Sequence, residues 1–303
     1  MDTEQKIIRT LAYFSVFQHP LTADEVFAYL WKGGIENREE IAGKLNSLVE
    51  TGKLGCKYGF YFFAGEEDNV EKRRAAVVPG DTMLRRAKWA TKLLSGVPFI
   101  EAIFVCNSVA AETANENSDI DLFIVTRPGR IWSVRFISNV VLLIFRLRTT
   151  KGHDSGRICL SFFVSENDLD LSKLRIAEDD IYLVYWIRQL LPVFDPKNIL
   201  QQLAEKNIWA ENFVKPRSVL KRSKRECVLK KLAEKILGSG LGEKFEKILK
   251  DWQWKKLRPE LKAKAKLGNN EVVISDGILK FHENDARHGI RAEWTKISSK
   301  YGA

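Results

Sequence analysis

The residues whose types and spacing best suit chemistry are two aspartates, Asp119 and Asp121, on one predicted β-strand. Side chains two residues apart on a strand point to the same face, so the two carboxylates lie side by side. Ile120, Leu122 and Ile124 then face the opposite side. Neighbouring anions repel each other, and such a pair normally persists because a cation neutralises it. Carboxylate oxygens suit Mg²⁺ or Mn²⁺, so the pair predicts a site for one of these ions.

A short polar turn upstream of the aspartates is a second candidate. Ser108 follows the apolar stretch 103–105, and ten residues separate it from Asp119. A turn at this point offers a hydroxyl group and backbone N–H groups, which bind phosphate oxygens. A metal ion held beside a phosphate group is what phosphoryl or nucleotidyl transfer requires. The two motifs together therefore predict one of these reactions.

This constellation resembles the nucleotidyltransferase superfamily of DNA polymerase β, whose hallmark is Gly-Ser, a short spacer and then Asp-x-Asp within an apolar strand. Here the motif reads Asn107-Ser108 followed by Asp119-Ile120-Asp121. Asn stands where the family usually has Gly, and Asn tolerates a left-handed backbone better than most residues. The resemblance implies that Asn107 and Ser108 bind the phosphates of a nucleoside triphosphate. It also implies that Asp119 and Asp121 are catalytic and hold the metal ion.

Active members of this superfamily usually carry a third acidic residue on the next strand. The corresponding strand here is 157–165, and its more polar face holds no carboxylate. That face consists of Arg157, Cys159, Ser161 and Ser165. Glu166 and Asp168 follow the strand and are the candidates for the third carboxylate. The alternatives are that both belong to an ordinary loop, and that the site either works with two carboxylates or is an inactive relic.

Two other groups of residues are weaker candidates. Arg127 follows the strand of the aspartates, and a guanidinium group binds phosphate oxygens with two parallel hydrogen bonds, so we expect it to bind the triphosphate. His282 lies near Asp285, but the apolar residues around it favour a packed C-terminal element over catalysis.

Composition limits the class of protein. The chain has 303 residues, of which 45% are hydrophobic and 29% charged, as expected for a globular protein of two or three domains. Its first residues lack a signal-peptide pattern, and the apolar run at 140–145 is too short to cross a bilayer. Four widely spaced cysteines, without Cys-x-x-Cys, fit buried reduced thiols. We therefore expect a cytoplasmic protein with no membrane partner.

The positive charge is concentrated in one part of the chain. Residues 1–66 contain 7 Lys or Arg and 9 Asp or Glu, a net charge of −2, whereas residues 215–266 contain 18 and 6, a net charge of +12. This excess predicts a polyanionic partner, with nucleic acid as the candidate, at residues 215–266. The alternative is a solvated helical face that carries Lys221, Arg222, Lys224, Arg225, Lys230 and Lys231.

Hydrophobic periodicity and capping residues predict the organisation of the first part. Helices at 3–17, 22–30 and 37–50, followed by a hairpin at 53–63, predict a winged helix-turn-helix. The third helix is rich in glutamate, which disfavours contact with DNA phosphates and favours a packing module.

The remainder is expected to alternate between helices and strands before a helical end. We expect a charged linker or helix start at 66–75, helices at 81–95 (capped by Asp81), 131–147 and 179–191, a late hairpin at 271–281, and a last helix from about residue 285. A winged helix followed by the segments 129–135, 158–163, 180–182 and 279–287 resembles a family of bacterial and archaeal nucleotidyltransferase-domain proteins.

We therefore expect an α+β protein with three parts: a winged helix-turn-helix (1–66), a nucleotidyltransferase core with a small mixed sheet (67–200), and a mainly helical basic region (201–303). The expected reaction is metal-dependent transfer of a nucleoside monophosphate from a nucleoside triphosphate to a hydroxyl acceptor. The rival interpretations are a catalytically inactive regulator that senses nucleotide or binds nucleic acid, and a toxin–antitoxin-type modifier. The acceptor, the preferred base and the oligomeric state stay open at this point.

Overall fold

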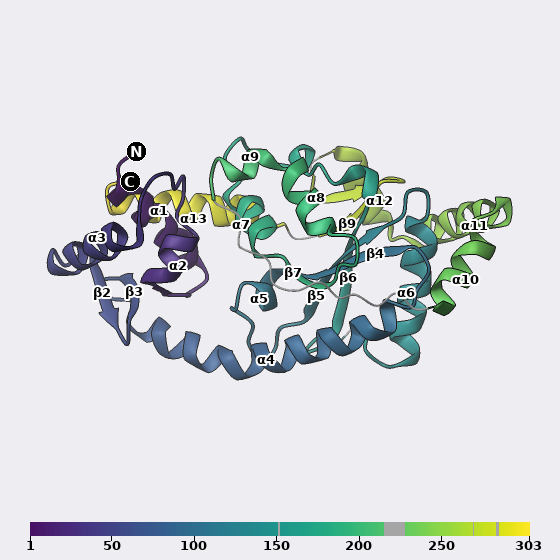
Figure 1. Cartoon of the computed structure of the whole chain (residues 1–303), viewed down its shortest axis with the longest axis horizontal. Coiled ribbons are helices and arrows are strands. Elements are labelled where there is room, and N and C mark those ends of the chain that lie inside the picture. The colour runs from purple at the N-terminus through teal and green to yellow at the C-terminus, as the bar shows by residue number, and fades with distance from the viewer. Residues whose placement is uncertain (151, 215–227, 269, 283–284) are drawn as a thin grey trace.

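The computed structural model describes residues 1–150, 152–214, 228–268, 270–282 and 285–303 (Figure 1). Within these ranges the chain forms thirteen α-helices, a three-stranded sheet and a six-stranded mixed sheet. The mixed α+β class predicted from the sequence is confirmed. No helix in these ranges combines the length and the apolar composition that crossing a membrane requires.

The N-terminal module, residues 1–66, packs three helices around a small antiparallel sheet. Its elements are α1 (Thr3–Val16), α2 (Ala23–Ala28), α3 (Arg38–Glu50), β1 (Leu21–Thr22), β2 (Leu54–Lys57) and β3 (Phe60–Phe63). Asp2 caps α1 and Thr22 caps α2, each in a capping box with the residue three positions later. The helices and the hairpin predicted for this part are therefore present, and reciprocal capping bonds fix the starts of α1 and α2.

A single long helix, α4 (Asp68–Leu94), joins this module to the large sheet (Figure 1). The helix start expected as one alternative at 66–75 is present, because α4 begins at Asp68, but the separate helix expected at 81–95 is wrong. The helix continues through Pro79, and Asp81 lies inside it rather than at its cap. A proline within a helix removes a backbone hydrogen bond and costs about 3 kcal/mol. Burial of apolar residues on both sides of Pro79 offsets that cost: Val70, Met83, Ala87, Ala90 and Leu94.

The large sheet has the strand order β7-β4-β5-β6-β9-β8. Its strands are β4 (Ile100–Val105), β5 (Ile120–Thr126), β6 (Ile158–Ser165), β7 (Leu191–Phe194), β8 (Val272–Ile274) and β9 (Ile278–Phe281). Strands β5 and β6 are parallel, and the other neighbouring pairs in this order are antiparallel. The strand of the two aspartates and the next predicted strand are therefore neighbours at the centre of the sheet.

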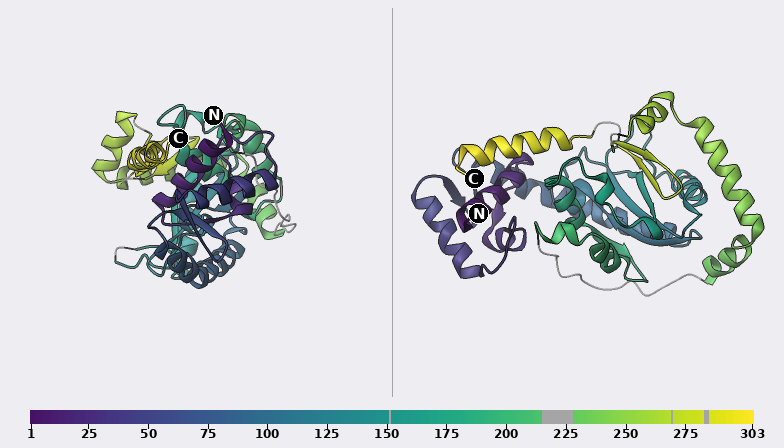
Figure 2. Two further views of the ribbon diagram at one scale, coloured as in Figure 1. Left: turned by 90° about the vertical axis from the view of Figure 1, so that its left-hand side faces the viewer. Right: turned by 90° about the horizontal axis from the view of Figure 1, so that it is seen from above.

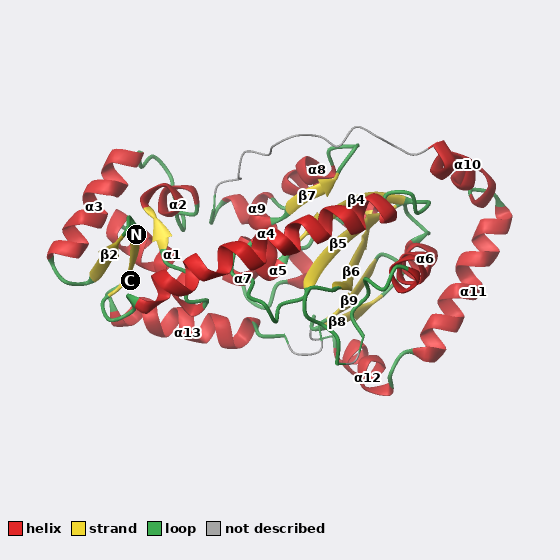
Figure 3. Ribbon diagram, turned by 90° about the horizontal axis from the view of Figure 1, so that it is seen from below, coloured by secondary structure: helices red, strands yellow, loops and turns green. Residues whose placement is uncertain are grey.

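Different helices cover the two faces of this sheet. On one face, α4 and α6 (Ile131–Ile144) pack against the strands, and Figure 3 shows α4 crossing over them. On the other face lies α7 (Ile181–Gln189), whose Trp186 ring packs against Phe123 and Phe162 at centroid distances of 5.1 and 5.4 Å. Successive side chains along each strand therefore point alternately into these two layers, as expected for β-strands.

The C-terminal third returns to both earlier parts of the chain. Its helices are α8 (Ile199–Lys206), α9 (Ile208–Glu211), α10 (Val228–Leu237), α11 (Gly240–Lys256), α12 (Pro259–Leu267) and α13 (Arg287–Lys300). The β8–β9 hairpin pairs with β6, and α13 lies along α1 (Figure 2). Residues beyond 200 thus complete both the large sheet and the N-terminal module.

The N-terminal module and the large sheet share one hydrophobic core. Tyr13 of α1 stacks on Tyr185 of α7 at 4.1 Å, and Trp31 meets Trp294 of α13 edge to face at 5.3 Å. The same cluster of buried side chains continues to Phe104 and Phe123 of the sheet. Aromatic pairs of this kind add to the free energy of burial, so α1 is fixed against the sheet face that carries α7.

Candidate functional site

Asp119 and Asp121 lie at the start of β5, as the sequence predicts. Asp119 immediately precedes the strand, and Asp121 is its second residue. Ile120, Leu122 and Ile124 are fully buried in the layer formed with α4 and α6. Asp121 therefore faces the opposite layer, where α7 and α1 lie.

Asn107 holds the turn that precedes the aspartates. The single-turn helix α5 (Asn107–Ala110) follows β4, and the φ angle of Asn107 is +54°. This is the left-handed conformation that Asn was expected to tolerate. Its side-chain oxygen accepts hydrogen bonds from Trp186 Nε1 at 2.8 Å and from the Tyr182 hydroxyl at 3.3 Å. These bonds fix the turn to α7 and leave Ser108 on the same side as Asp121.

A third potential ligand lies beside the two aspartates. Cys159 of β6 is the register partner of Asp121 in the parallel pair. A carboxylate oxygen of Asp119, one of Asp121 and the Cys159 sulfur all lie within 4.8 Å of one another. The thiol also hydrogen-bonds to both carboxylates. The sequence places Cys159 on the polar face of its strand, but not beside Asp121, because register across a sheet is not a local property.

Burial and mutual repulsion disfavour the charged forms of the two carboxylates. Burial raises the pKa of Asp121 to about 6, and the charge of Asp119 adds to this effect. Hydrogen bonds from Asn107, Cys159 and Ser161 act in the opposite direction. Burial also raises the pKa of Asp119. A nearby cation favours ionised carboxylates, so the pair is electrostatically suited to a divalent ion.

Asp121 faces a cavity of about 550 Å³, a size typical of small-molecule and cofactor sites. One wall is polar and holds Asn107, Ser108, Asp121, Cys159 and Ser161. A second set of lining residues, the aromatic wall, comes from α1, the residue after it and α7: Tyr13, Phe14, Phe17, Tyr182 and Trp186. Polar groups and flat aromatic surfaces in one cavity suit a ligand that joins a polar group to a planar ring.

The end of β9 adds a histidine to the polar wall. The Nε2 atom of His282 lies 3.2 Å from the Ser161 hydroxyl, and that hydroxyl donates to Asp121 at 3.5 Å. Burial lowers the pKa of His282 to about 4, so its ring is neutral near pH 7. The sequence favoured a packing role for His282. The structure gives it one, against Phe162, but also connects it to the carboxylates through Ser161.

Two cations line the same cavity but already have anionic partners. Lys280 pairs with Asp285 at 3.1 Å, and Arg287 pairs with Asp285 at 2.7 Å and with Asp180 at 3.0 Å. All four side chains are largely buried. Their charges cancel locally, so this network fixes the hairpin and α13 in place rather than attracting an anion.

Glu166 and Asp168 lie at the other end of the strands. Because β5 and β6 are parallel, their starts lie together and their ends lie together, with Thr126 beside Ser165. Glu166 and Asp168 follow Ser165 in a short 3₁₀ turn. The five residues from Asp121 to the end of β5 span roughly 16 Å at about 3.3 Å per residue. Neither side chain can complete the site from there.

Arg127 is also at the far end of β5. It donates hydrogen bonds of 2.9 Å to Glu101 and 2.9 Å to Glu234, and its guanidinium group lies 5.1 Å from the centre of the Phe99 ring. The expectation that Arg127 binds phosphate beside the aspartates is therefore corrected. Its position after the strand, rather than before it, places it in a structural ion-pair cluster.

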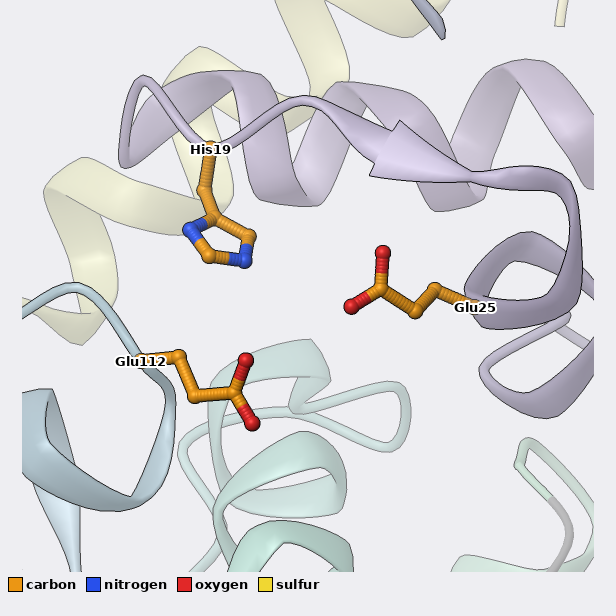
Figure 4. Close-up of side chains that lie close together, drawn as sticks. All are labelled: His19, Glu25 and Glu112. Atoms are coloured by element: carbon orange, nitrogen blue, oxygen red, sulfur yellow. The ribbon is translucent and has the colours of Figure 1, made fainter. Parts of the chain in front are cut away.

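A second group of potential metal ligands lies between the N-terminal module and the loop after α5 (Figure 4). It consists of His19, Glu25 and Glu112, whose ligand atoms lie within 4.8 Å of one another. Glu25 already accepts hydrogen bonds from Arg73 and from the backbone and hydroxyl of Thr22. Arg73 also lies 3.9 Å from Glu112. The Arg73 guanidinium therefore supplies the positive charge beside Glu25 and Glu112. We interpret the cluster as a set of ion pairs that links the N-terminal module to the core.

The basic region is described only in part. Lys221, Arg222, Lys224 and Arg225 lie outside the described residues. One face of α11 packs against α6, whereas Trp252 and Trp254 keep 43% and 38% of their surface exposed. The ammonium group of Lys256 lies 4.2 Å from the centre of the Trp252 ring. Exposed lysines accompany these rings at positions 244, 247, 255 and 256. This surface presents cations together with aromatic faces to solvent.

Comparison with known proteins gave no relative. No protein-family model matches the chain, and neither the curated proteins nor the solved structures contain a match. What the chain does is therefore inferred from the geometry of the site.

Proposed function

We propose that this chain is a metal-dependent nucleotidyltransferase, which transfers a nucleoside monophosphate from a nucleoside triphosphate to a hydroxyl acceptor. The observation that supports it most directly is that Ser108 and Asp121 line one nucleotide-sized cavity, with Asp119 beside them. The mixed sheet, with both aspartates at the start of a central strand, is also what the resemblance to the superfamily of DNA polymerase β implies.

Each residue of the cavity has a role in this proposal. The Ser108 hydroxyl and the backbone N–H groups of its turn donate to phosphate oxygens. The aromatic wall from α1 and α7 packs against the base. The oxygen of the acceptor bonds to the α-phosphorus, the bond to the β-phosphate breaks, pyrophosphate leaves, and the hydroxyl proton passes to solvent. A divalent ion would neutralise the phosphate charge during this step.

The residues present fit one divalent ion. Asp119 and Asp121 offer oxygen ligands, burial raises the pKa of both, and a cation beside them would favour their charged forms. No other carboxylate belongs to this cluster within the described part of the chain. The two aspartates support a single divalent ion that shares its coordination with the nucleotide.

The N-terminal module fits a winged helix-turn-helix that serves in packing rather than in DNA reading. The basic residues of α3 are already paired, Arg38 with Asp24 at 2.8 Å and Lys44 with Glu4 at 2.9 Å. DNA affinity depends mainly on free cations that reach phosphates. The module instead places α1 against the cavity, where Tyr13 contributes to the aromatic wall.

Calorimetric titration with Mg²⁺ and a nucleoside triphosphate tests this proposal. Wild type should bind the pair, and the double variant Asp119→Asn with Asp121→Asn should lose affinity by about 100-fold because the metal ligands are gone. Asp170→Asn, an exposed aspartate outside the cavity, is the matched control and should bind like wild type. Equal affinity in wild type and the double variant would show that the nucleotide binds elsewhere.

A nucleotide-sensing regulator without transfer activity is the second candidate. It is favoured by the position of Glu166 and Asp168, which leaves Cys159 and Ser161 where active relatives of DNA polymerase β carry a carboxylate. Incubation with each labelled nucleoside triphosphate and Mg²⁺ or Mn²⁺ separates the two candidates. Pyrophosphate release supports the transferase, and binding without release supports the regulator.

A further inference from the structure

The donor set at the start of β5 and β6 is not the one that Mg²⁺ prefers. Two of its three members, Asp119 and Asp121, offer oxygen, whereas Cys159 offers sulfur. Mg²⁺ requires near-octahedral oxygen coordination and binds thiolates poorly, whereas Zn²⁺ and Co²⁺ accept sulfur, nitrogen and oxygen together. The third ligand, the Cys159 sulfur, therefore determines which metal ion the site selects.

The carboxylates also have the surroundings of metal ligands. Asp121 accepts hydrogen bonds from the Asn107 side chain and from the Ser161 hydroxyl, which is itself held by His282. Partners of this kind fix the orientation of a ligating carboxylate, and metal affinity depends on them. Asn107 is anchored in turn by Trp186. The ligands are thus held in place by residues from α5, β6 and α7 and by the residue that follows β9.

Cys159 could instead form a disulfide with Cys106, a nearby cysteine at the same sheet, but the spacing of the strands excludes this bond. Cys106 follows β4 and Cys159 lies on β6, with β5 between these strands. Two strand spacings amount to roughly 9.5 Å, which exceeds the Cα–Cα limit of about 7 Å for a disulfide. Both thiols are free. The Cys159 sulfur is therefore available to an ion.

We propose that Asp119, Asp121 and Cys159 form a mixed oxygen–sulfur site that takes a transition-metal ion, Zn²⁺ or Co²⁺, in preference to Mg²⁺. Binding forms a bond between the metal and the Cys159 sulfur as the S–H bond breaks, and the thiol proton leaves to solvent. The inference rests on the proposed function in one respect, namely that the same ion then contacts the phosphates of the nucleotide.

Cobalt spectroscopy on the full chain tests the sulfur ligand directly. Metal-free protein titrated with Co²⁺ should show a sulfur-to-cobalt charge-transfer absorption band in the near ultraviolet. Cys159→Ser should lose the band and bind Co²⁺ about 10-fold or more weakly. Cys56→Ser, which removes an exposed thiol outside the site, is the matched control and should keep the band. A band that persists in Cys159→Ser, or no band in wild type, overturns the proposal.

A second variant tests ion selection by restoring oxygen at the third position. Cys159→Asp should bind Mg²⁺ about 10-fold more tightly than wild type and Co²⁺ more weakly, because all three ligands are then carboxylates. Unchanged selectivity in this variant overturns the proposal even if Cys159→Ser fails to fold.

These experiments also separate the inference from the proposed function. A cobalt band without any nucleotide binding supports the metal site and contradicts nucleotidyl transfer. Nucleotide binding with Mg²⁺ and no cobalt band supports the transferase and contradicts the mixed site.

Discussion

The side-chain oxygen of Asn107 accepts a hydrogen bond of 2.8 Å from the indole N–H of Trp186. Asn107 also stands at the one position where the motif departs from the Gly-Ser of the superfamily it resembles. Its left-handed backbone, with φ at +54°, is one that glycine adopts without cost. Asparagine lacks the conformational freedom of glycine, but its side chain fixes the turn to α7. The same side chain lowers the pKa of Asp121 through a hydrogen bond.

Asn107→Ala and Asn107→Gly should therefore differ in stability. Alanine keeps the unfavourable backbone and leaves the Trp186 N–H without its partner, so we expect a loss of about 2 to 4 kcal/mol in the free energy of unfolding. Glycine loses the hydrogen bond but relaxes the backbone, so its loss should be about 1 kcal/mol smaller. Urea denaturation measures both. A glycine variant as stable as wild type would contradict the anchoring role, and an alanine variant at least as stable as the glycine variant would contradict the backbone cost.

The raised pKa of Asp121 predicts a pH dependence of stability in metal-free protein. The pKa is about 6 in the folded state, above the 3.8 that is usual for an aspartate, so the folded state binds this proton more tightly. Ionised Asp121 destabilises the folded state. This effect is absent below pH 3.8, grows as the pH rises from 3.8 to about 6, and is complete above about 6. We expect the free energy of unfolding to fall by on the order of 3 kcal/mol across this window. Denaturation of wild type and Asp121→Asn from pH 4 to 7.5, with a chelator, isolates the contribution, which the variant should lack.

Glu166→Gln and Asp168→Asn should leave pyrophosphate release within about twofold of wild type, because neither side chain reaches the aspartates. Ser161→Ala is the contrasting variant. It removes a hydrogen bond to Asp121 and the link to His282, so it should lower turnover. Steady-state rates with saturating nucleotide provide the comparison. A loss of orders of magnitude at Glu166 or Asp168 would be incompatible with the parallel register of β5 and β6.

Arg127→Gln should affect stability and not nucleotide affinity. The change removes a hydrogen-bonded partner from Glu101, which is 1% exposed, although Lys197 still pairs with it at 2.7 Å. We expect a loss of about 1 to 3 kcal/mol in the free energy of unfolding. Arg74→Gln, which breaks an exposed pair with Glu71, is the control and should cost under about 1 kcal/mol. Weaker nucleotide binding with unchanged stability would restore the phosphate-binding role.

Any contact with nucleic acid should map to the basic region rather than to the N-terminal module. Reversal of Lys244, Lys247, Lys255 and Lys256 to Glu should abolish binding, as should reversal of Lys221, Arg222, Lys224 and Arg225. Reversal of Arg38 and Lys44, which are already paired, should have little effect. Wild-type affinity for duplex DNA should fall with salt at a log–log slope near −0.9 per phosphate contact. Gel-shift titrations with the opposite pattern would make α3 the DNA-binding element.

The parts of the fold that were predictable depend on local patterns. Thr22 and Glu25 form the capping box that marks the start of α2, and alternation around Asp121 places its side chain opposite Ile120 and Leu122. The left-handed turn at Asn107 also follows from the residue type. In each case the information lies within a few residues of the chain.

The parts that were not predictable depend on neighbours distant in sequence. Cys159 and Glu166 lie on the same predicted strand and turn, and only the parallel register decides that the first is beside Asp121 while the second is at the far end. Arg127 is a different case, because it follows the end of β5 while the aspartates lie at the start of the same strand. The continuity of α4 through Pro79 likewise depends on packing against the sheet, which offsets an unfavourable local residue.

The packing of α13 along α1 has a consequence for biosynthesis. The side chains of the first helices share their core with Trp294, whose indole N–H donates to the backbone carbonyl of Arg9 at 2.9 Å. Residue 294 leaves the ribosome on the order of ten seconds or more after α1, at typical elongation rates. During that interval the aromatic surface of α1 lacks its final cover. The N-terminal module therefore reaches its final packing only after α13 has been translated.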